Sequence, residues 1–461
     1  MAPTTTRDAV VAPKIETVLT SLLGKDYFKQ VEEGDDSDTT EFMLESRQKA
    51  FDWIVNQDPL QLEYASPNLV QRFLLVLFYY QTTRHEPWKE CNPPSTFQGG
   101  TPSDFCYKLD PVTGETTSDI WGDQWLTKSH ECQWAGMICE TVQTKAKTVV
   151  GVSVRWNRLN GPLPWEIAQL PHLKQLHLND NMLSGMLPPK LLSYSLERLQ
   201  LGNNQLSGHI PAIWFENLHD GNAKLTSLQI DENWLTGTIP SEVGLFPMEV
   251  VHLHQNQLSG SLPVELSAHT SLKILLLGYN DLTGTVPSEF GLLTSLKGNL
   301  YLGHTHISGT LPSEIALLST LQDIDLSSTN MQGTLPQEMY TGLTDLRAFS
   351  GNNCNFSGTI SSSLGLLTSL VWLRLANNNF HGTIPSEIEE LTSLMHLVVN
   401  GNQLTGTVPA SLCLSAAFVE IYGAALVADC LPNQETGLPT IVCAADCCTS
   451  CCDNTGVCLG N

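Results

Sequence analysis

Histidine, tyrosine and acidic side chains are concentrated in the middle of this chain. Imidazoles and carboxylates can exchange protons or bind a cation, and tyrosine rings add aromatic surface that ends in a hydroxyl. Such a group suits recognition of a protein, peptide or glycan partner, because aromatic side chains are enriched at interfaces. The predicted partner-binding residues are Asp231, Glu232, His252, His254, Tyr279, Tyr301 and His304.

Motifs of known catalytic sites are absent from the sequence. It contains no phosphate-cradling loop, no nucleophile elbow and no kinase motif set, and His130-Glu131 lacks the second histidine of a zinc protease. Asp323 and Asp325 could suggest glycoside hydrolysis, but residues two apart in a strand always share a face, so an acidic protein carries such pairs by chance. The sequence therefore predicts a protein that is not an enzyme, with no cofactor and no metal.

A repeat of about two dozen residues must position the predicted binding residues. Its pattern, L-x-x-L-x-L-x-x-N-x-L-x-G-x-I/L-P, occurs eleven times between Val149 and Pro409. A unit of this size cannot bury its own apolar side and must stack on copies of itself, so the pattern predicts a solenoid. The repeated glycines are Gly161, Gly185, Gly208, Gly237, Gly260, Gly284, Gly309, Gly333, Gly358, Gly382 and Gly406.

The L-x-L segment of each repeat has the alternation of a half-buried strand. Side by side, these strands form one parallel sheet, with Leu275 and Leu277 facing the core and Leu276 facing outward. The predicted centre of the binding patch is expected to share this outward register on consecutive strands, and it consists of His252, His254, Tyr279 and Tyr301.

An asparagine follows most of these strands. Its amide both donates and accepts hydrogen bonds, so a column of asparagines can pair the backbone groups that a tight coil leaves open. Thr305, Thr329 and Cys354 replace it in three consecutive repeats, where this bonding is expected to be weakest. The asparagines of the column are Asn157, Asn181, Asn204, Asn233, Asn256, Asn280, Asn378 and Asn402.

The complete pattern, with its L-x-G-x-I-P half, resembles the plant-type leucine-rich repeat family. The resemblance implies an α/β repeat solenoid, a leucine-rich repeat horseshoe with short parallel strands on its concave face. Upstream, Trp125 and the run Cys132-Gln-Trp134-Ala-Gly136-Met-Ile-Cys139 resemble the end of the N-terminal cap of that family. This resemblance implies a disulfide between Cys132 and Cys139, with Trp134 lying over the first repeat.

The chain divides into four expected segments. Residues 1–42 form a disordered acidic leader, 43–148 a helical and disulfide-bearing N-terminal cap, 149–412 the repeats and 413–461 a cysteine-rich tail. Within the cap, one helix is expected to stop at Pro59 and another to start at Ser66, and Cys91 and Cys106 are expected to pair. The eight tail cysteines favour disulfides over a zinc site, the alternative that Cys448-x-x-Cys451 suggests.

The net charge of −24 limits the kinds of partner that the chain can bind. A polyanion is a poor ligand for nucleic acid or an anionic membrane, because it gains nothing from counterion release. The strongly apolar run Phe73–Tyr80 is far too short to span a membrane. Cysteine usage favours a secreted or cell-surface protein with an incomplete leader, and the missing apolar leader leaves the cytoplasm as the alternative.

These observations predict a non-enzymatic recognition scaffold that binds its partner through the concave face. The resemblance to plant-type receptor ectodomains adds a membrane co-receptor as an expected associate. The alternatives are a structural or adhesive cell-wall or matrix protein and an inhibitor of a hydrolase. Asn355 begins an N-x-S sequon and is a predicted glycosylation site.

Overall fold

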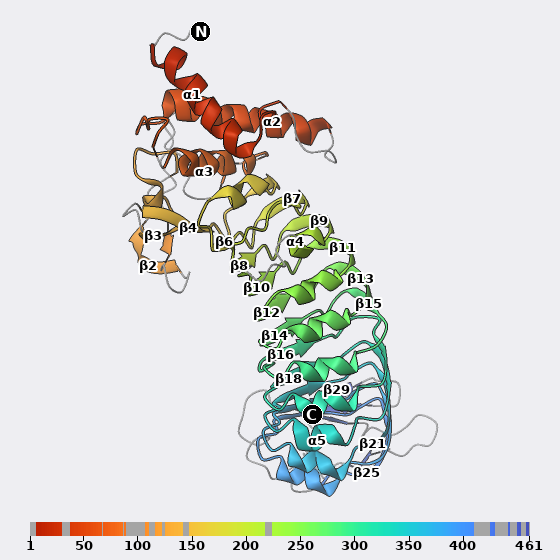
Figure 1. Ribbon diagram of the computed structural model, residues 1–461. Coiled ribbons are helices and arrows are strands. Elements are labelled where there is room, and N and C mark those ends of the chain that lie inside the picture. The colour runs from red at the N-terminus through yellow and green to blue at the C-terminus, as the bar shows by residue number, and fades with distance from the viewer. Residues whose placement is uncertain are drawn as a thin grey trace. The chain divides into compact units, whose positions relative to one another are not determined.

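Figure 1 shows the protein as a computed structural model. The structure describes residues 6–29, 37–66, 68–85, 87–88, 107–109, 116–121, 125–141, 147–216, 224–409, 425–428, 441–442, 450–452 and 458–460. Its internal contacts divide the chain into two compact units, Met1–Leu235 and Thr236–Asn461. Among the residues with described placement, no helix is long and apolar enough to cross a bilayer.

The first unit begins with three α-helices, α1 (Thr6–Leu23), α2 (Ser37–Asp52) and α3 (Leu69–Gln81). The prediction of a disordered leader over residues 1–42 is wrong for α1 and for the start of α2. Ile15 and Leu19 of α1 are buried. Apolar side chains on one face of α1 pack inside the unit. The acidic run that follows α1 suggests disorder and hides this apolar face in the sequence.

The helix expected to stop at Pro59 ends earlier, because α2 passes at Trp53 into a π-helical turn, η1 (Trp53–Gln57). The helix expected from Ser66 starts slightly later, with Asn68 as the residue that precedes α3. The Ser66 hydroxyl accepts a 3.4 Å hydrogen bond from the Asn68 amide. Ser66 therefore bonds to the chain ahead of the helix instead of capping the helix itself.

The strands of the first unit build two sheets after a short hairpin. In the larger sheet β3 and β4 are antiparallel, and β4, β6, β8 and β10 are parallel and in register. The bounds are β1 Tyr107–Leu109, β2 Thr116–Trp121, β3 Met137–Thr141, β4 Lys147–Ser153, β5 Asn160–Pro162, β6 Gln175–His177, β7 Met182–Met186, β8 Arg198–Gln200, β9 Gln205–His209 and β10 Ser227–Gln229. Between them lie η2 Glu131–Gln133, η3 Trp165–Gln169 and α4 Ile213–Glu216, and β11 Trp234–Thr238 spans the unit boundary.

The second unit repeats one coil: a strand, a turn, a second strand and a short helix. The first strands pair as one parallel sheet and the second strands pair on another side of the coil. The first set is β12 Val250–His252, β14 Ile274–Leu276, β16 Asn299–Tyr301, β18 Asp323–Asp325, β20 Ala348–Ser350, β22 Trp372–Arg374 and β24 His396–Val398. The second set is β13 Gln257–Ser261, β15 Asp281–Thr283, β17 Ser308–Gly309, β19 Asn330–Gly333, β21 Asn355–Thr359, β23 Asn379–Thr383 and β25 Gln403–Thr407.

Short helices complete the coils, and strands continue beyond the last repeat. The helices are η4 Ser241–Leu245, η5 Val264–Ala268, η6 Ser288–Leu292, η7 Ser313–Leu317, α5 Glu338–Gly342, η8 Ser362–Leu366 and η9 Ser386–Glu390. The later strands are β26 Ala425–Ala428, β27 Ile441–Val442, β28 Ser450–Cys452 and β29 Cys458–Gly460. Because β26 pairs in parallel with β24, the sheet continues past Pro409, where the sequence repeat ends.

The predicted solenoid of short parallel strands is confirmed. Leu275 and Leu277 are fully buried, and Leu276 between them is half-buried. Each repeated glycine has a positive φ, and from Gly260 to Gly406 each one also lies against a side chain of the preceding coil. A Cβ on Gly260 (φ +80°) would lie 2.8 Å from the Thr238 methyl, and one on Gly358 (φ +85°) 2.7 Å from the Thr334 methyl. Any larger residue at these glycines would push neighbouring coils apart.

The asparagine column joins consecutive coils. Asn280 Oδ1 accepts from Leu258 N at 2.9 Å, and its Nδ2 donates to the carbonyls of Leu253, Leu277 and Gly278 at 2.9, 2.9 and 3.2 Å. One side chain therefore pairs backbone groups of its own coil and of the preceding one.

Where threonine replaces asparagine, the bonding is local. Thr305 Oγ1 donates to Leu302 O at 2.8 Å and accepts from Ile307 N at 3.5 Å, both within its own coil. Cys354 Sγ reaches the preceding coil, at Leu326 O, over 3.1 Å. The column thus changes from bonding between coils to bonding mainly within them.

Candidate functional site

The outward side chains of the parallel sheet in the second unit form a surface that we call the strand face. Strand register aligns the last residue of each strand with its neighbours. This column consists of His252, Leu276, Tyr301, Asp325, Ser350, Arg374 and Val398. A second column is made by the first residues of the same strands: Val250, Ile274, Asn299, Asp323, Ala348, Trp372 and His396.

Tyr279 and His304 lie beside the strands, in the turns that follow them. Their φ angles are +55° and +57°, so both occupy a left-handed turn position shared by successive coils. The prediction that Tyr279 shares the strand register is therefore wrong. The two rings stack, with centroids 4.0 Å apart and planes 13° apart, and Tyr279 is 52% exposed. The turn thus presents an aromatic surface next to the strand face.

His252 and His254 lie two residues apart and both are half-buried. Their rings meet edge to face at 6.0 Å. Burial, and then the nearby His254, lowers the pKa of His252 to about 4. His252 is therefore neutral from pH 7 to pH 5 and cannot supply a charge change in that range.

Tyr301 is half-buried in the first column. Burial raises the pKa of its hydroxyl, and the Asp323 and Asp325 carboxylates raise the pKa further. The hydroxyl is thus a neutral hydrogen-bond donor at physiological pH, on a ring that a partner can cover.

The two aspartates beside Tyr301 are engaged in the sheet. Asp323 Oδ2 accepts from Asn299 Nδ2 at 3.1 Å, and Asp325 Oδ1 accepts from the Ser327 backbone amide at 2.9 Å. Burial raises the pKa of Asp323, and Arg347 opposes that rise. Both carboxylates therefore help to order the middle of the strand face.

Trp372 and His396 extend the aromatic surface and were missing from the predicted set. Trp372 is exposed, and the two rings lie 6.2 Å apart on adjacent strands. Burial and Arg374 lower the pKa of His396. The first residue of each three-residue strand shares a face with the last one. The alternation in the sequence could therefore have identified Trp372 and His396.

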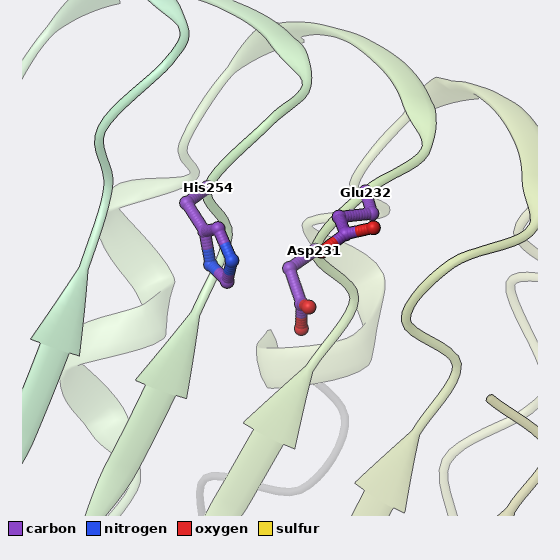
Figure 2. Close-up of side chains that lie close together, drawn as sticks. All are labelled: Asp231, Glu232 and His254. Atoms are coloured by element: carbon purple, nitrogen blue, oxygen red, sulfur yellow. The ribbon is translucent and has the colours of Figure 1, made fainter. Parts of the chain in front are cut away.

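Asp231 and Glu232 belong to the first unit and follow β10, whereas His254 belongs to the second unit. Figure 2 shows the two acids on the segment that follows one strand and His254 on the segment that follows another. The Asp231 carboxylate covers Gly202, where an added Cβ would lie 3.0 Å from its oxygens. Carboxylate and imidazole are both groups that bind metal ions in proteins.

The predicted cap and modification residues lie outside the strand face. Cys132 and Cys139 form a disulfide, and Trp134 is buried beside it. Cys91 and Cys106 lie outside the described residues, as do the side chains of the tail cysteines. Asn355 is exposed at the start of β21.

Comparisons with known proteins agree with this architecture. The Leucine Rich Repeat family model matches residues 195–217, 271–293 and 369–391. Receptor-like protein 18 of Arabidopsis thaliana is 34% identical over 204 residues, which cover 44% of this chain and 20% of that protein. Receptor-like protein 6 of the same plant is 27% identical over 283 residues, which cover 58% of this chain and 25% of that protein. The chain thus spans a quarter or less of these relatives.

Two solved structures share the fold. The plant peptide hormone receptor RGFR1, in complex with RGF2, has 30% identity and a TM-score of 0.53 over 58% of this chain and 42% of its own. The Arabidopsis receptor kinase HAESA, in complex with the peptide hormone IDA and the co-receptor SERK1, has 30% identity and a TM-score of 0.54 over 62% of this chain and 50% of its own. The repeat pattern, the coils and these similarities lead to one conclusion: the chain is a leucine-rich repeat solenoid, and its similarities support the plant-type family of these repeats.

Proposed function

We propose that this chain is a non-enzymatic recognition scaffold whose strand face binds an extended peptide segment of a partner at the cell surface. The observation that carries the proposal is the exposed Tyr279–His304 stack beside the column that contains Tyr301 and His252. Aromatic rings held rigidly at a surface lose little conformational entropy on binding, so they make good anchors.

The geometry suits an extended ligand. Adjacent strands lie ~4.8 Å apart, so each coil offers one outward side chain per column at a regular interval. Along the first column, apolar Leu276 and aromatic Tyr301 are followed by the polar side chains of Asp325, Ser350 and Arg374. A peptide crossing several coils would meet apolar contacts and charged contacts in a fixed order.

The relatives support both the ligand class and the location. RGFR1 is a peptide hormone receptor that was solved with RGF2, and HAESA was solved with the peptide hormone IDA and the co-receptor SERK1. By analogy, this chain would bind a peptide outside the cell and recruit a membrane co-receptor for signalling. The disulfide between Cys132 and Cys139 fits an oxidising compartment.

The test has two stages. Proteins and peptides retained from a cell-surface extract are identified, and the retained segment is then synthesised and titrated calorimetrically against the wild type and Tyr279→Ala/Tyr301→Ala. The double variant should bind more weakly than the wild type, by roughly 1–3 kcal/mol for each truncated ring. The control is Tyr194→Ala, an exposed tyrosine of the first unit, which should leave affinity unchanged.

Three outcomes contradict the proposal. Equal affinity of the double variant and the wild type would place the site away from the strand face. Retention of wall polysaccharide alone would favour the structural or adhesive alternative. Retention of a hydrolase that loses activity on binding would favour the inhibitor alternative.

A further inference from the structure

The short helices of the second unit carry exposed leucines at one repeated position, away from the strand face. Consecutive helices are neighbours along the unit (Figure 1). Leu245, Leu292, Leu317 and Leu366 each end their helix and are 56, 57, 59 and 55% exposed, whereas the intervening helices η5 and α5 end at Ala268 and Gly342. We call these four residues the leucine row. Four such similar exposures at equivalent positions indicate a shared orientation of the side chain.

The residues on either side explain why this leucine faces outward. The preceding residue packs against the next coil: a Cβ on Gly291 would lie 2.6 Å from the Glu314 carbonyl oxygen. The following residue, such as Leu293 or Leu318, is fully buried. The leucine between them has no inward direction left. Its place in the repeat therefore keeps it at the surface. Large exposed apolar surfaces mark interaction sites.

A row of glutamates runs beside the leucine row. Glu289 and Glu314 precede Leu292 and Leu317 by three residues, and in a 3₁₀-helix side chains three apart eclipse each other. Ser288 Oγ donates to Glu289 Oε2 at 3.1 Å, and an equivalent bond of 3.2 Å joins Ser313 to Glu314. Exposed glutamates at the same position of other coils are Glu265, Glu338 and Glu387.

The spacing of the coils matches that of an α-helix. Coils repeat every ~4.8 Å where their strands pair, and an α-helix advances ~5.4 Å per turn. A helix lying along the stack would therefore bring about one side chain per turn to each coil, with apolar contacts on Leu292 and Leu317 of successive coils and small residues at Ala268 and Gly342 on either side. Its flanking side chains would lie over the glutamate row.

We propose that the leucine row docks a basic amphipathic helix of a partner protein. The helix buries its apolar face on the leucines and pairs its lysines or arginines with the glutamates. The negative charge of the glutamates favours a basic helix over other partners. A second copy of the chain would bring glutamate against glutamate on a protein of net charge −24, and an anionic membrane would be repelled by the same row.

The experiment uses the full chain and a labelled synthetic peptide of about 18 residues, roughly five helical turns. The peptide carries leucines on one face and lysines on both flanks, and a matched peptide has glutamates in place of the lysines. Affinity is measured by fluorescence anisotropy for the wild type, Leu292→Gln/Leu317→Gln and Glu289→Gln/Glu314→Gln. Met186→Gln, an equally exposed apolar residue of the first unit, is the control.

The lysine peptide should bind the wild type and the control, at least about tenfold weaker to the leucine variant, and with reduced salt dependence to the glutamine variant. Thermal melting should be the same for all four proteins, because the substituted side chains are exposed. Equal binding of both peptides, or of the wild type and the leucine variant, would overturn the proposal. Dimerisation in light scattering that the leucine variant abolishes would instead assign the row to a second copy, and leucine-dependent binding to anionic vesicles would assign it to a membrane.

Discussion

Buried polar groups hold irregular backbone both ahead of the repeats and within them, but the groups differ in charge. In the first unit, the buried guanidinium of Arg72 bonds to Asp58 and Glu131 at 3.0 Å and to the carbonyls of Thr127 and Ser129. In the repeats of both units, neutral amides such as Asn204 and Asn280 make the equivalent backbone bonds.

The difference follows from regularity. A repeated coil presents the same few open backbone groups each time, and one amide satisfies them. The part of the first unit that precedes the repeats brings together loops with no shared spacing. The five donors of an arginine can reach carbonyls of such loops in several directions. Charge is thus used where geometry is irregular, at the cost of desolvation.

The largest effect is expected from removing the charge that joins these loops. Arg72→Met should destabilise the first unit by about 3–5 kcal/mol, because Asp58 and Glu131 would remain buried without their cation. Urea unfolding followed by tryptophan fluorescence measures this loss. The matched control is Lys174→Met, which breaks an exposed pair with Glu140 and should cost at most about 1 kcal/mol.

The pH dependence of the free energy of unfolding should also differ between the two units. Burial, together with Arg155 and Arg198, lowers the pKa of His177 to about 4. The unfolded chain binds the proton near pH 6.5, so stability is complete above that pH and falls as pH drops toward 4. The loss should approach about 3 kcal/mol.

His177→Gln should remove most of this slope for the first unit. His252 also has a pKa near 4 but is more open to solvent, so its contribution to the second unit should be smaller. An unaltered slope in His177→Gln would mean that other groups carry the pH dependence.

The amide column gives the next effect. Asn280→Ala should cost roughly 1–3 kcal/mol, since backbone groups of two coils lose their partner. Thr305→Ala should cost less, because the threonine bonds lie within one coil. Chemical denaturation of the two variants measures the difference, and equal losses would mean that bonding between coils adds nothing.

The smallest effect on folding is expected at the strand face. Leu276→Asp should leave the free energy of unfolding nearly unchanged and alter only partner binding. Leu275→Asp, one residue earlier, should bury a charge and prevent cooperative folding of its neighbours. Circular dichroism melts of the pair check the predicted alternation directly.

The sequence specified the coils well, because each repeat states the same physical requirement many times. The alternation around Leu275 and the bonds of Asn280 follow from local pattern alone. The burial of α1 does not, because α1 packs against η1, which lies beyond the acidic run in the sequence. The placement of Tyr279 in a left-handed turn was missed for another reason: a non-glycine residue with positive φ is uncommon, and only stacking with neighbouring coils imposes it.

The contact between Thr238 and Gly260 joins each coil only to the next one, and it recurs as Thr334 on Gly358. A gene duplication that copies one whole repeat therefore reproduces both halves of the contact and leaves each junction matched. A duplication of half a repeat would place a methyl group where no glycine receives it. The lineage of this chain can thus lengthen or shorten its strand face by whole coils.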